Sequence, residues 1–290
     1  MIECVLFTIE YWKKGGCAML VLLIAAVCFG CAGVTGTNDA KMSAKDVNSQ
    51  LKAAPPQKIS AVPNDSNEID MILARLDQKG RELKTYEAKI TYVFKQPVLE
   101  SETTREGMLY YMNNEKGSSL RIIFMALRQD KEIVPDYREE YLFDGVQLTR
   151  VDYKLKNVEY RQLAEANQPI NAFDLASQYL PIVGFTKAGT LRDDFEIAQS
   201  ATSEYDELLL KTKPQSRYKN DYTQIRFWIS KRLSLPSRME TTSPQEDISL
   251  IWFSDVKANK ELPADIFKIE VPADFSKNVI PFEKKRSKDS

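Results

Sequence analysis

Apolar positions along the chain recur first every three or four residues and then every second residue. After Asn67, which can cap a helix, the apolar side chains between Ile69 and Leu83 lie near the 3.6-residue spacing of an amphipathic helix. From Tyr86 to Phe94 every second residue is aromatic or aliphatic, which predicts a half-buried strand. The pattern therefore predicts a helix followed by the first strand of a sheet.

The rest of the pattern predicts many short strands joined by short turns. The dipeptide Asp144-Gly145 is a strong hairpin signal between two of them. The further strand candidates are Glu106–Met112, Leu120–Leu127, Arg138–Phe143, Val146–Tyr153, Val158–Leu163, Glu207–Thr212, Tyr222–Ser230, Ser237–Thr242, Ile248–Asp255 and Phe267–Val271. One segment, Asn171–Leu180, predicts a short helix that ends near Pro181. We therefore expect a mostly antiparallel β fold with helices.

A meandering sheet of this size must cover its apolar face, and only two helices are predicted to do so. Three architectures satisfy this requirement. They are a closed barrel, a sandwich, and a curved open sheet with helices in its concavity.

Composition removes several classes of function. The chain has 40 basic and 41 acidic residues, so it lacks the basic excess of a nucleic-acid-binding protein. It contains no histidine, which excludes Ser–His and Cys–His catalysis and imidazole metal ligands. All four cysteines precede residue 32, so the folded part has no cysteine nucleophile or thiolate metal site. We expect no enzymatic activity, no cofactor and no metal.

Adjacent carboxylates are the remaining candidates for chemistry. Glu139-Glu140 lies in a predicted strand, where neighbouring side chains point to opposite faces, so the two cannot share a site. We expect both of them to be solvated surface residues.

The N-terminal segment carries the pattern of an exported protein. Lys13 and Lys14 precede twelve uncharged residues, Ala18–Phe29, which is typical of a secretory signal and shorter than a membrane-spanning helix. Gly30-Cys31 then resembles a bacterial lipobox, in which the cysteine is lipidated; ordinary cleavage after Ala32 is the alternative. We expect export to the periplasmic face of the cell envelope, with Cys31 as lipid anchor to the outer or the inner membrane.

Four segments follow from these patterns. Residues 1–31 form the signal segment, and residues 32–66 form a disordered linker that is polar and rich in Pro, Gly and Ser. Residues 67–275 form the folded domain. Residues 276–290 form a charged tail.

The C-terminal third contains an ordered series of short motifs. Phe227–Glu240 holds a strand, a Leu-Pro turn and an Arg-containing strand; Ile248–Val256 is a further strand; and Leu262–Pro272 contains Leu-Pro, Ile-Phe and Val-Pro in that order. Leu83–Ala88 and the Asp144-Gly145 hairpin fit the same series. This succession resembles the bacterial outer-membrane lipoprotein carrier family, the LolA/LolB-like proteins.

The resemblance covers about residues 68–275 and implies both a fold and a function. The family fold is an incomplete barrel of about eleven antiparallel strands, with helices over its concave apolar face. Family members shield the acyl chains of lipoproteins that cross the periplasm, or receive them at the outer membrane. We accordingly expect a non-enzymatic carrier whose partners are acylated lipoproteins or lipids. Family members also place a basic residue on an early strand, for which Arg105 and Arg121 are the candidates.

Two alternatives of another class stay open. The same fold serves envelope sensors that bind a protein partner, and a purely structural envelope lipoprotein would have a filled core.

Side chains at strand spacing either form such a packed core or line a lipid cavity. The residues expected to line the cavity are Tyr86, Ile90, Tyr92, Phe94, Met108, Tyr110, Ile122, Phe124, Trp228 and Trp252. The residues expected on a lid over the cavity are Phe173, Leu175, Tyr179 and Leu180.

Overall fold

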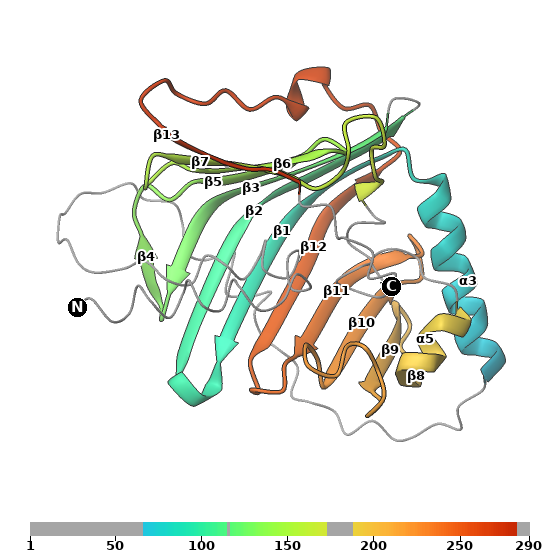
Figure 1. Ribbon diagram of the computed structural model, residues 1–290. Helices are drawn as coiled ribbons and strands as arrows, with labels where there is room; N and C mark the ends of the chain where they lie inside the picture. Colours follow the sequence, from blue (N-terminus) through green and yellow to red (C-terminus); the bar gives the residue numbers. More distant parts are fainter. Residues whose placement is uncertain (1–65, 115–116, 173–187, 283–290) are drawn as a thin grey trace, which may run out of the picture.

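A large open sheet of thirteen strands dominates the computed structural model (Figure 1), which describes residues 66–114, 117–172 and 188–282. The strands follow the order β13-β7-β6-β5-β3-β2-β1-β12-β11-β10-β9-β8, and β4 pairs with β3 outside this path. All strand pairs are antiparallel except β13 and β7, which are parallel. The prediction of an incomplete, mostly antiparallel barrel is therefore confirmed, with thirteen strands instead of about eleven.

The elements of the described ranges are two α-helices, two 3-10 turns and the thirteen strands. The helices are α3 (Ser66–Glu82) and α5 (Ala188–Asp194), and the 3-10 turns are η1 (Pro97–Leu99) and η2 (Ala264–Phe267). The strands are β1 (Thr85–Gln96), β2 (Ser101–Asn114), β3 (Gly117–Gln129), β4 (Glu132–Val134), β5 (Glu139–Phe143), β6 (Gln147–Asp152), β7 (Asn157–Gln162), β8 (Phe195–Ala201), β9 (Tyr205–Thr212), β10 (Gln224–Ser230), β11 (Leu235–Thr242), β12 (Ile248–Ala258) and β13 (Ser276–Ile280).

Several elements differ from the sequence-based expectation. The helix after Asn67 is α3 and the alternating segment is β1, as predicted. The elements β4, β8, β13 and α5 were not predicted, and Phe267–Val271 is the end of η2 followed by irregular chain instead of a strand. β13 also carries the sheet past residue 275, the expected end of the domain. The helix expected at Asn171–Leu180 lies outside the described residues beyond Ala172.

Different parts of the chain cover the two faces of the sheet. We call the face that carries Tyr86, Ala88, Ile90 and Tyr92 the inner face, and the opposite one the outer face. Helix α3 packs against the inner face next to β11 and contacts α5, beside the β8–β11 end of the sheet (Figure 1). The apolar face of α3 is deeply buried there, with exposed fractions of 1–5% for Ile69, Ile72, Leu73 and Leu76.

The C-terminal segment covers the outer face over β5–β7 (Figure 1). After β12 the chain crosses this face, and Phe275 packs there against Val151 of β6 and Val158 of β7. β13 then pairs with β7.

A close backbone approach between β2 and β3 requires a glycine. At Gly107 the pairing contains a bulge, and a Cβ atom added there would lie 1.9 Å from the Ile123 carbonyl oxygen. Only a residue without a side chain fits this position.

No helix of the described ranges has the length and apolarity needed to cross a membrane.

Candidate functional site

Apart from a smaller cluster around Tyr86, Ala88 and Tyr111, the inner face carries one continuous apolar cluster. The cluster begins at α3, includes inner-face residues of β8–β12 and β1, and reaches Phe124 of β3 and Tyr141 of β5. Six of the residues expected to line a cavity lie on this face: Tyr86, Ile90, Tyr92, Phe94, Ile122 and Phe124. The exposed fractions of Ile90, Tyr92 and Phe124 are only 1–2%. The open sheet thus presents a broad, buried apolar face, which α3 and α5 cover at its β8–β11 end.

The other four expected lining residues lie on the outer face. Met108 pairs with Lys89, and Tyr110 pairs with Glu87. Because directly paired residues point to the same face, both side chains point away from Tyr92.

Trp228 and Trp252 also lie on the outer face, with Arg238 of β11 between them. The Arg238 guanidinium carbon lies 4.0 Å from the centroid of Trp228 and 5.2 Å from that of Trp252. The two indole rings therefore stack on a cation.

The remaining expected site residues lie outside the described residues. They are the lid residues Phe173, Leu175, Tyr179 and Leu180 and the lipidation site Cys31.

A buried charged chain interrupts the apolar inner face. Arg105 on β2 is 1% exposed, and its Nε donates to the Tyr137 hydroxyl at 3.1 Å. The Tyr137 hydroxyl donates to Glu139 Oε2 at 2.7 Å, and Arg150 Nε donates to Glu139 Oε1 at 2.8 Å. The Arg105 guanidinium lies 5.9 Å from the Tyr92 ring centroid. Burial, followed by the charge of Glu139, raises the pKa of Tyr137 and keeps it a neutral donor.

A second buried carboxylate, Glu140, lies on the outer face. It accepts hydrogen bonds from Arg121, from Arg138 Nε at 2.8 Å and from the Tyr153 hydroxyl at 3.0 Å. Arg121 also donates to the Ile266 carbonyl and so ties the C-terminal segment to β3. Of the two early-strand arginines, Arg105 therefore lies on the inner face and Arg121 on the outer.

Of the two expectations for Glu139 and Glu140, the structure agrees with one and contradicts the other. Glu139 and Glu140 do point to opposite faces, but the prediction that they are solvated is wrong, because both are 0% exposed. Each charge is compensated by one partner two residues away, Tyr137 for Glu139 and Arg138 for Glu140, and by partners 11 to 19 residues away, Arg150, Arg121 and Tyr153, which a local pattern does not reveal. Burial alone raises the pKa of Glu140, but the hydrogen bonds from Arg121 and Arg138 outweigh burial, so this pKa lies below its ordinary value.

The cluster around Glu140 opens into a depression of about 390 Å³ on the outer face. Its walls include Asp265, Lys268 and Glu270 of the C-terminal segment. The number of cationic side chains in the walls of this depression equals the number of carboxylates, so their charges cancel.

The described residues contain no group of three or more His, Cys, Asp or Glu arranged to hold a metal ion.

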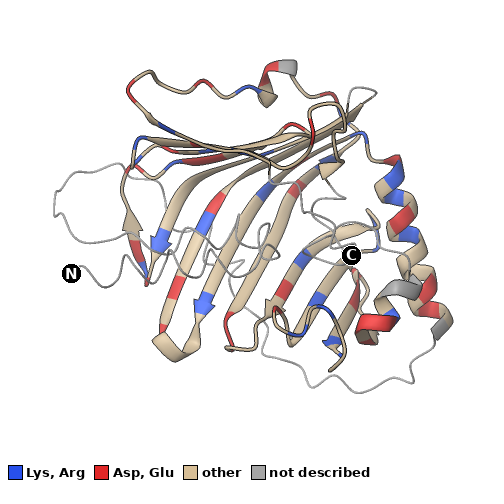
Figure 2. Ribbon diagram, viewed as in Figure 1, with Lys and Arg blue, Asp and Glu red and all other residues tan. Residues whose placement is uncertain are grey.

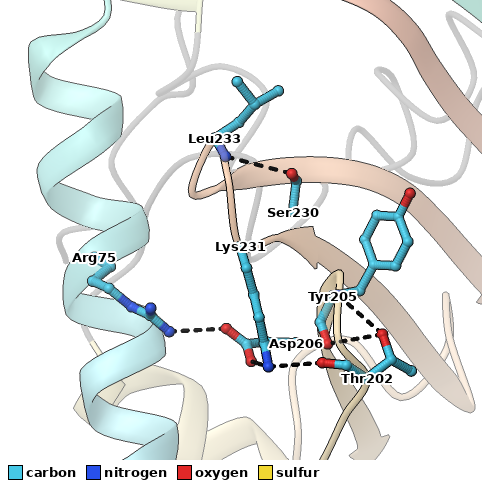
Figure 3. Close-up of polar contacts among 7 residues, drawn as sticks. All are labelled: Arg75, Thr202, Tyr205, Asp206, Ser230, Lys231 and Leu233. Atoms are coloured by element: carbon cyan, nitrogen blue, oxygen red, sulfur yellow. Dashed lines mark hydrogen bonds and ion pairs between the residues drawn. The ribbon is translucent and has the colours of Figure 1, made fainter.

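Helix α3 is tied to the sheet by polar contacts as well as by its apolar face. Arg75 Nη2 lies 2.8 Å from Asp206 Oδ2, and Lys231 Nζ lies 3.5 Å from Asp206 Oδ1 (Figure 3). The same Lys231 ammonium donates to the Thr202 carbonyl at 2.7 Å (Figure 3). A second pair, Asp70 and Arg192 at 2.9 Å, joins α3 to α5. Basic and acidic residues are interspersed along α3 and over the strands (Figure 2).

Comparison with known proteins finds one family model that is similar to part of the chain. Residues 132–270 match the family model described as outer membrane lipoprotein carrier protein LolA. No curated protein matches the chain.

Solved structures resemble the chain at low sequence identity. An uncharacterized conserved protein from Thermus thermophilus has 10% identity and a TM-score of 0.45, over 74% of this chain and 99% of that one. The Pseudomonas aeruginosa MucA/MucB complex has 14% identity and a TM-score of 0.42, over 70% and 61%. The Mycobacterium tuberculosis lipoprotein LppX has 10% identity and a TM-score of 0.39, over 67% and 98%.

The family match covers strands from both parts of the sheet. It begins at β4 and ends after η2, so it includes strands on both sides of α5 in the sequence. This match over residues 132–270, together with the open antiparallel sheet, supports a LolA-like family for the chain.

Proposed function

We propose that this protein binds the acyl chains of lipids or lipoproteins on its inner face and carries or receives them without catalysing a reaction. The observation that supports this proposal most directly is the large apolar cluster from α3 to Tyr141 on an open sheet. An open sheet can admit a long chain that a closed, filled barrel excludes. The match to the lipoprotein carrier family supports the same class of ligand.

The energetics of an acyl chain suit such a surface. Burial of an acyl chain contributes roughly 0.8 kcal/mol per methylene, so a chain of about fifteen carbons gains more than 10 kcal/mol. A carrier must also release its cargo. Because the inner face is already covered in the empty protein, ligand binding has to displace that cover, and this displacement offsets part of the gain.

The proposal includes a place in the cell. We propose that the protein works at the periplasmic face of the envelope, held by a lipid on Cys31, with acylated lipoproteins or lipids as partners. A lipid anchor supplies most of the membrane affinity of such a protein. Replacing Cys31 by serine should therefore move the protein out of the membrane fraction, and equal partitioning of variant and wild type would remove the anchor.

Bound lipid is the direct test of the binding function. We expect native mass spectrometry of the purified protein to show adducts with the mass of an acylated lipid, and we expect solvent extraction to remove them. The absence of any lipid, together with stoichiometric capture of a protein partner, would instead support the envelope sensor.

The location of the ligand can be tested with brominated fatty acid, which quenches nearby tryptophans. Phe94 lies on the inner face and packs against the apolar cluster, whereas Trp228 and Trp252 lie on the outer face. A Phe94→Trp variant should gain a strongly quenched emission component that the wild type lacks. Equal quenching of the wild type and the variant would show that the ligand does not bind on the inner face.

A further inference from the structure

The depression beside Glu140 on the outer face has two walls of different origin. One wall belongs to the sheet and its adjoining turns, with Arg121, Arg138 and Tyr153 around the Glu140 carboxylate. The other wall is the C-terminal segment, which the hydrogen bond from Arg121 to the Ile266 carbonyl holds against β3. Because the depression lies on the face opposite the proposed acyl-chain surface, it is a separate candidate site.

The C-terminal wall presents alternate side chains to the depression. Ile269 and Val271 pack on the outer-face apolar cluster around Phe275. Lys268 and Glu270, which alternate with them, are exposed and line the depression. Lys268 has an extended backbone, in which neighbouring side chains point in opposite directions. Burial of the apolar set therefore leaves the charged set on the wall of the depression.

The sheet wall has an excess of positive charge and a guanidinium that is fixed in place. Arg121 and Arg138 share the single Glu140 carboxylate. Arg138 donates to it from Nε and Nη2 and stacks at 4.7 Å on the Tyr153 ring, yet its side chain is 52% exposed. Within the described ranges, no hydrogen bond uses Nη1 of Arg138. This guanidinium thus keeps donor capacity for an anion from solvent.

The C-terminal wall has the opposite charge. Asp265, Lys268 and Glu270 are exposed, and none of them forms an ion pair with another residue that the structure describes. Two carboxylates and one ammonium leave this wall with an excess of negative charge. A ligand in the depression therefore meets a cationic wall on one side and an anionic wall on the other.

From this opposition of charge we infer that the depression binds a zwitterion, phosphoethanolamine, either as a lipid headgroup or as a soluble ester. Guanidinium groups favour phosphate oxygens, so the phosphate lies against Arg138. The ammonium then lies against Asp265 and Glu270. The volume of about 390 Å³ is within the range of small-molecule sites, which begins near roughly 300 Å³. The site adds to the proposed acyl-chain binding and does not depend on it.

Calorimetric titration of the full chain with O-phosphoethanolamine tests the site. We expect the wild type to bind it and Arg138→Gln to bind about tenfold more weakly, because glutamine keeps a donor for Glu140 but removes the charge. Arg128→Gln is the matched control: Arg128 pairs with Glu106 outside the depression, so this variant should bind like the wild type. A wild type that does not bind, or a folded Arg138→Gln with wild-type affinity, would overturn the inference and leave the acyl-chain function unaffected.

The carboxylate wall allows a test that does not disturb the buried Glu140 cluster. Glu270→Gln should bind phosphoethanolamine about threefold to tenfold more weakly, because the ammonium loses a carboxylate partner. The same variant should bind inorganic phosphate more tightly, since phosphate has no ammonium and is repelled by Glu270. Equal affinity of the wild type for the two ligands, or a change in the same direction for both in Glu270→Gln, would overturn the assignment to a zwitterion.

Vesicles distinguish the two sources of the ligand. If the ligand is a lipid headgroup, vesicles of phosphatidylethanolamine and phosphatidylcholine should sediment more of the full chain than vesicles of phosphatidylcholine alone, whose headgroup has no N–H donor. Arg138→Gln should remove this difference. Equal sedimentation with both vesicles, together with binding of O-phosphoethanolamine, would assign the site to a soluble ester.

Discussion

At the scale of single residues, the most consequential pair is Glu139 and Glu140, two neighbours buried on opposite faces of β5. Removing a carboxylate from water is costly, and each of these two is compensated by at least one arginine and one tyrosine hydroxyl. Breaking such a cluster costs more than an exposed ion pair because the remaining cation stays partly desolvated.

Glu140→Ala is therefore expected to lower the free energy of unfolding by about 3–5 kcal/mol. The reason is that Arg121, 9% exposed, loses its carboxylate partner while it remains buried. Urea denaturation would measure the change. The control is Glu102→Ala, whose exposed pair with Lys95 should contribute less than about 1 kcal/mol; similar losses in both variants would contradict this account.

The lowered pKa of Glu140 predicts a direction for the dependence of stability on pH. Because the unfolded state takes up the proton at higher pH than the folded state, the Glu140 contribution is complete above the ordinary glutamate pKa of about 4.3. It is lost as the pH falls from there through the folded pKa. Unfolding curves between pH 7 and pH 3 should therefore show a smaller acid loss in Glu140→Gln than in the wild type.

At the scale of elements, alternation along a strand is a reliable guide to secondary structure and a poor guide to the site. It predicts β1 and most of its neighbours. It does not say which of the two alternating sets of side chains on one strand lies on the same face as which set on the next strand. Two register shifts, between Glu106 and Gly107 and between Trp228 and Ile229, change that relation within a strand pair. Met108 and Trp228 are placed by regular pairing instead: Met108 pairs with Lys89, and Trp228 is linked through Arg238 and Trp252 to Thr91, so both lie on the face opposite Tyr92.

Edges and long-range partners are the other features that the sequence could not supply. β13 lies at one end of the sheet, where little burial imposes an apolar pattern on the chain; its residues Ser276–Val279 are all exposed. The partners of Asp206 lie 131 residues upstream and 25 residues downstream in the chain, so no local motif links them.

Gly107 gives the sharpest prediction for an element. A methyl group at this position would overlap the Ile123 carbonyl, so Gly107→Ala must push β2 and β3 apart. We expect a loss of about 3 kcal/mol or more in unfolding free energy, at the upper end for a single substitution. Gly117 provides the comparison: a Cβ atom there meets nothing within 4 Å, and only its positive φ of 128° opposes a side chain. An alanine at residue 107 that costs no more than one at residue 117 would contradict the close approach of the two strands.

At the scale of the whole molecule, the sheet consists of two meanders joined by a single seam. β1–β7 form one and β8–β12 the other, and the pairing of β1 with β12 joins them. The C-terminal segment then crosses the outer face of the first meander and ends on β7. The inner-face cluster spans the seam, so the proposed ligand site depends on both meanders.

The C-terminal crossing should be held mainly by Phe275. This side chain is 8% exposed and packs on β6 and β7, whereas β13 contributes almost only exposed residues. Phe275→Ala is expected to cost about 3 kcal/mol of unfolding free energy. Ending the chain after residue 275 should cost less, as measured by urea denaturation; a larger loss from the truncation would show that the parallel pairing of β13 is the stronger contact.

The β1–β12 seam also sets a delay during synthesis of the protein. Tyr86 pairs with Ala258, so the edge of β1 waits for a partner that the ribosome adds 172 residues later. At about 5–20 residues per second this takes roughly 10 to 30 seconds, far longer than a hairpin needs to form. Throughout that time the first meander has an unpaired edge next to its apolar face, so the nascent chain is most exposed to aggregation while its second half is still being made.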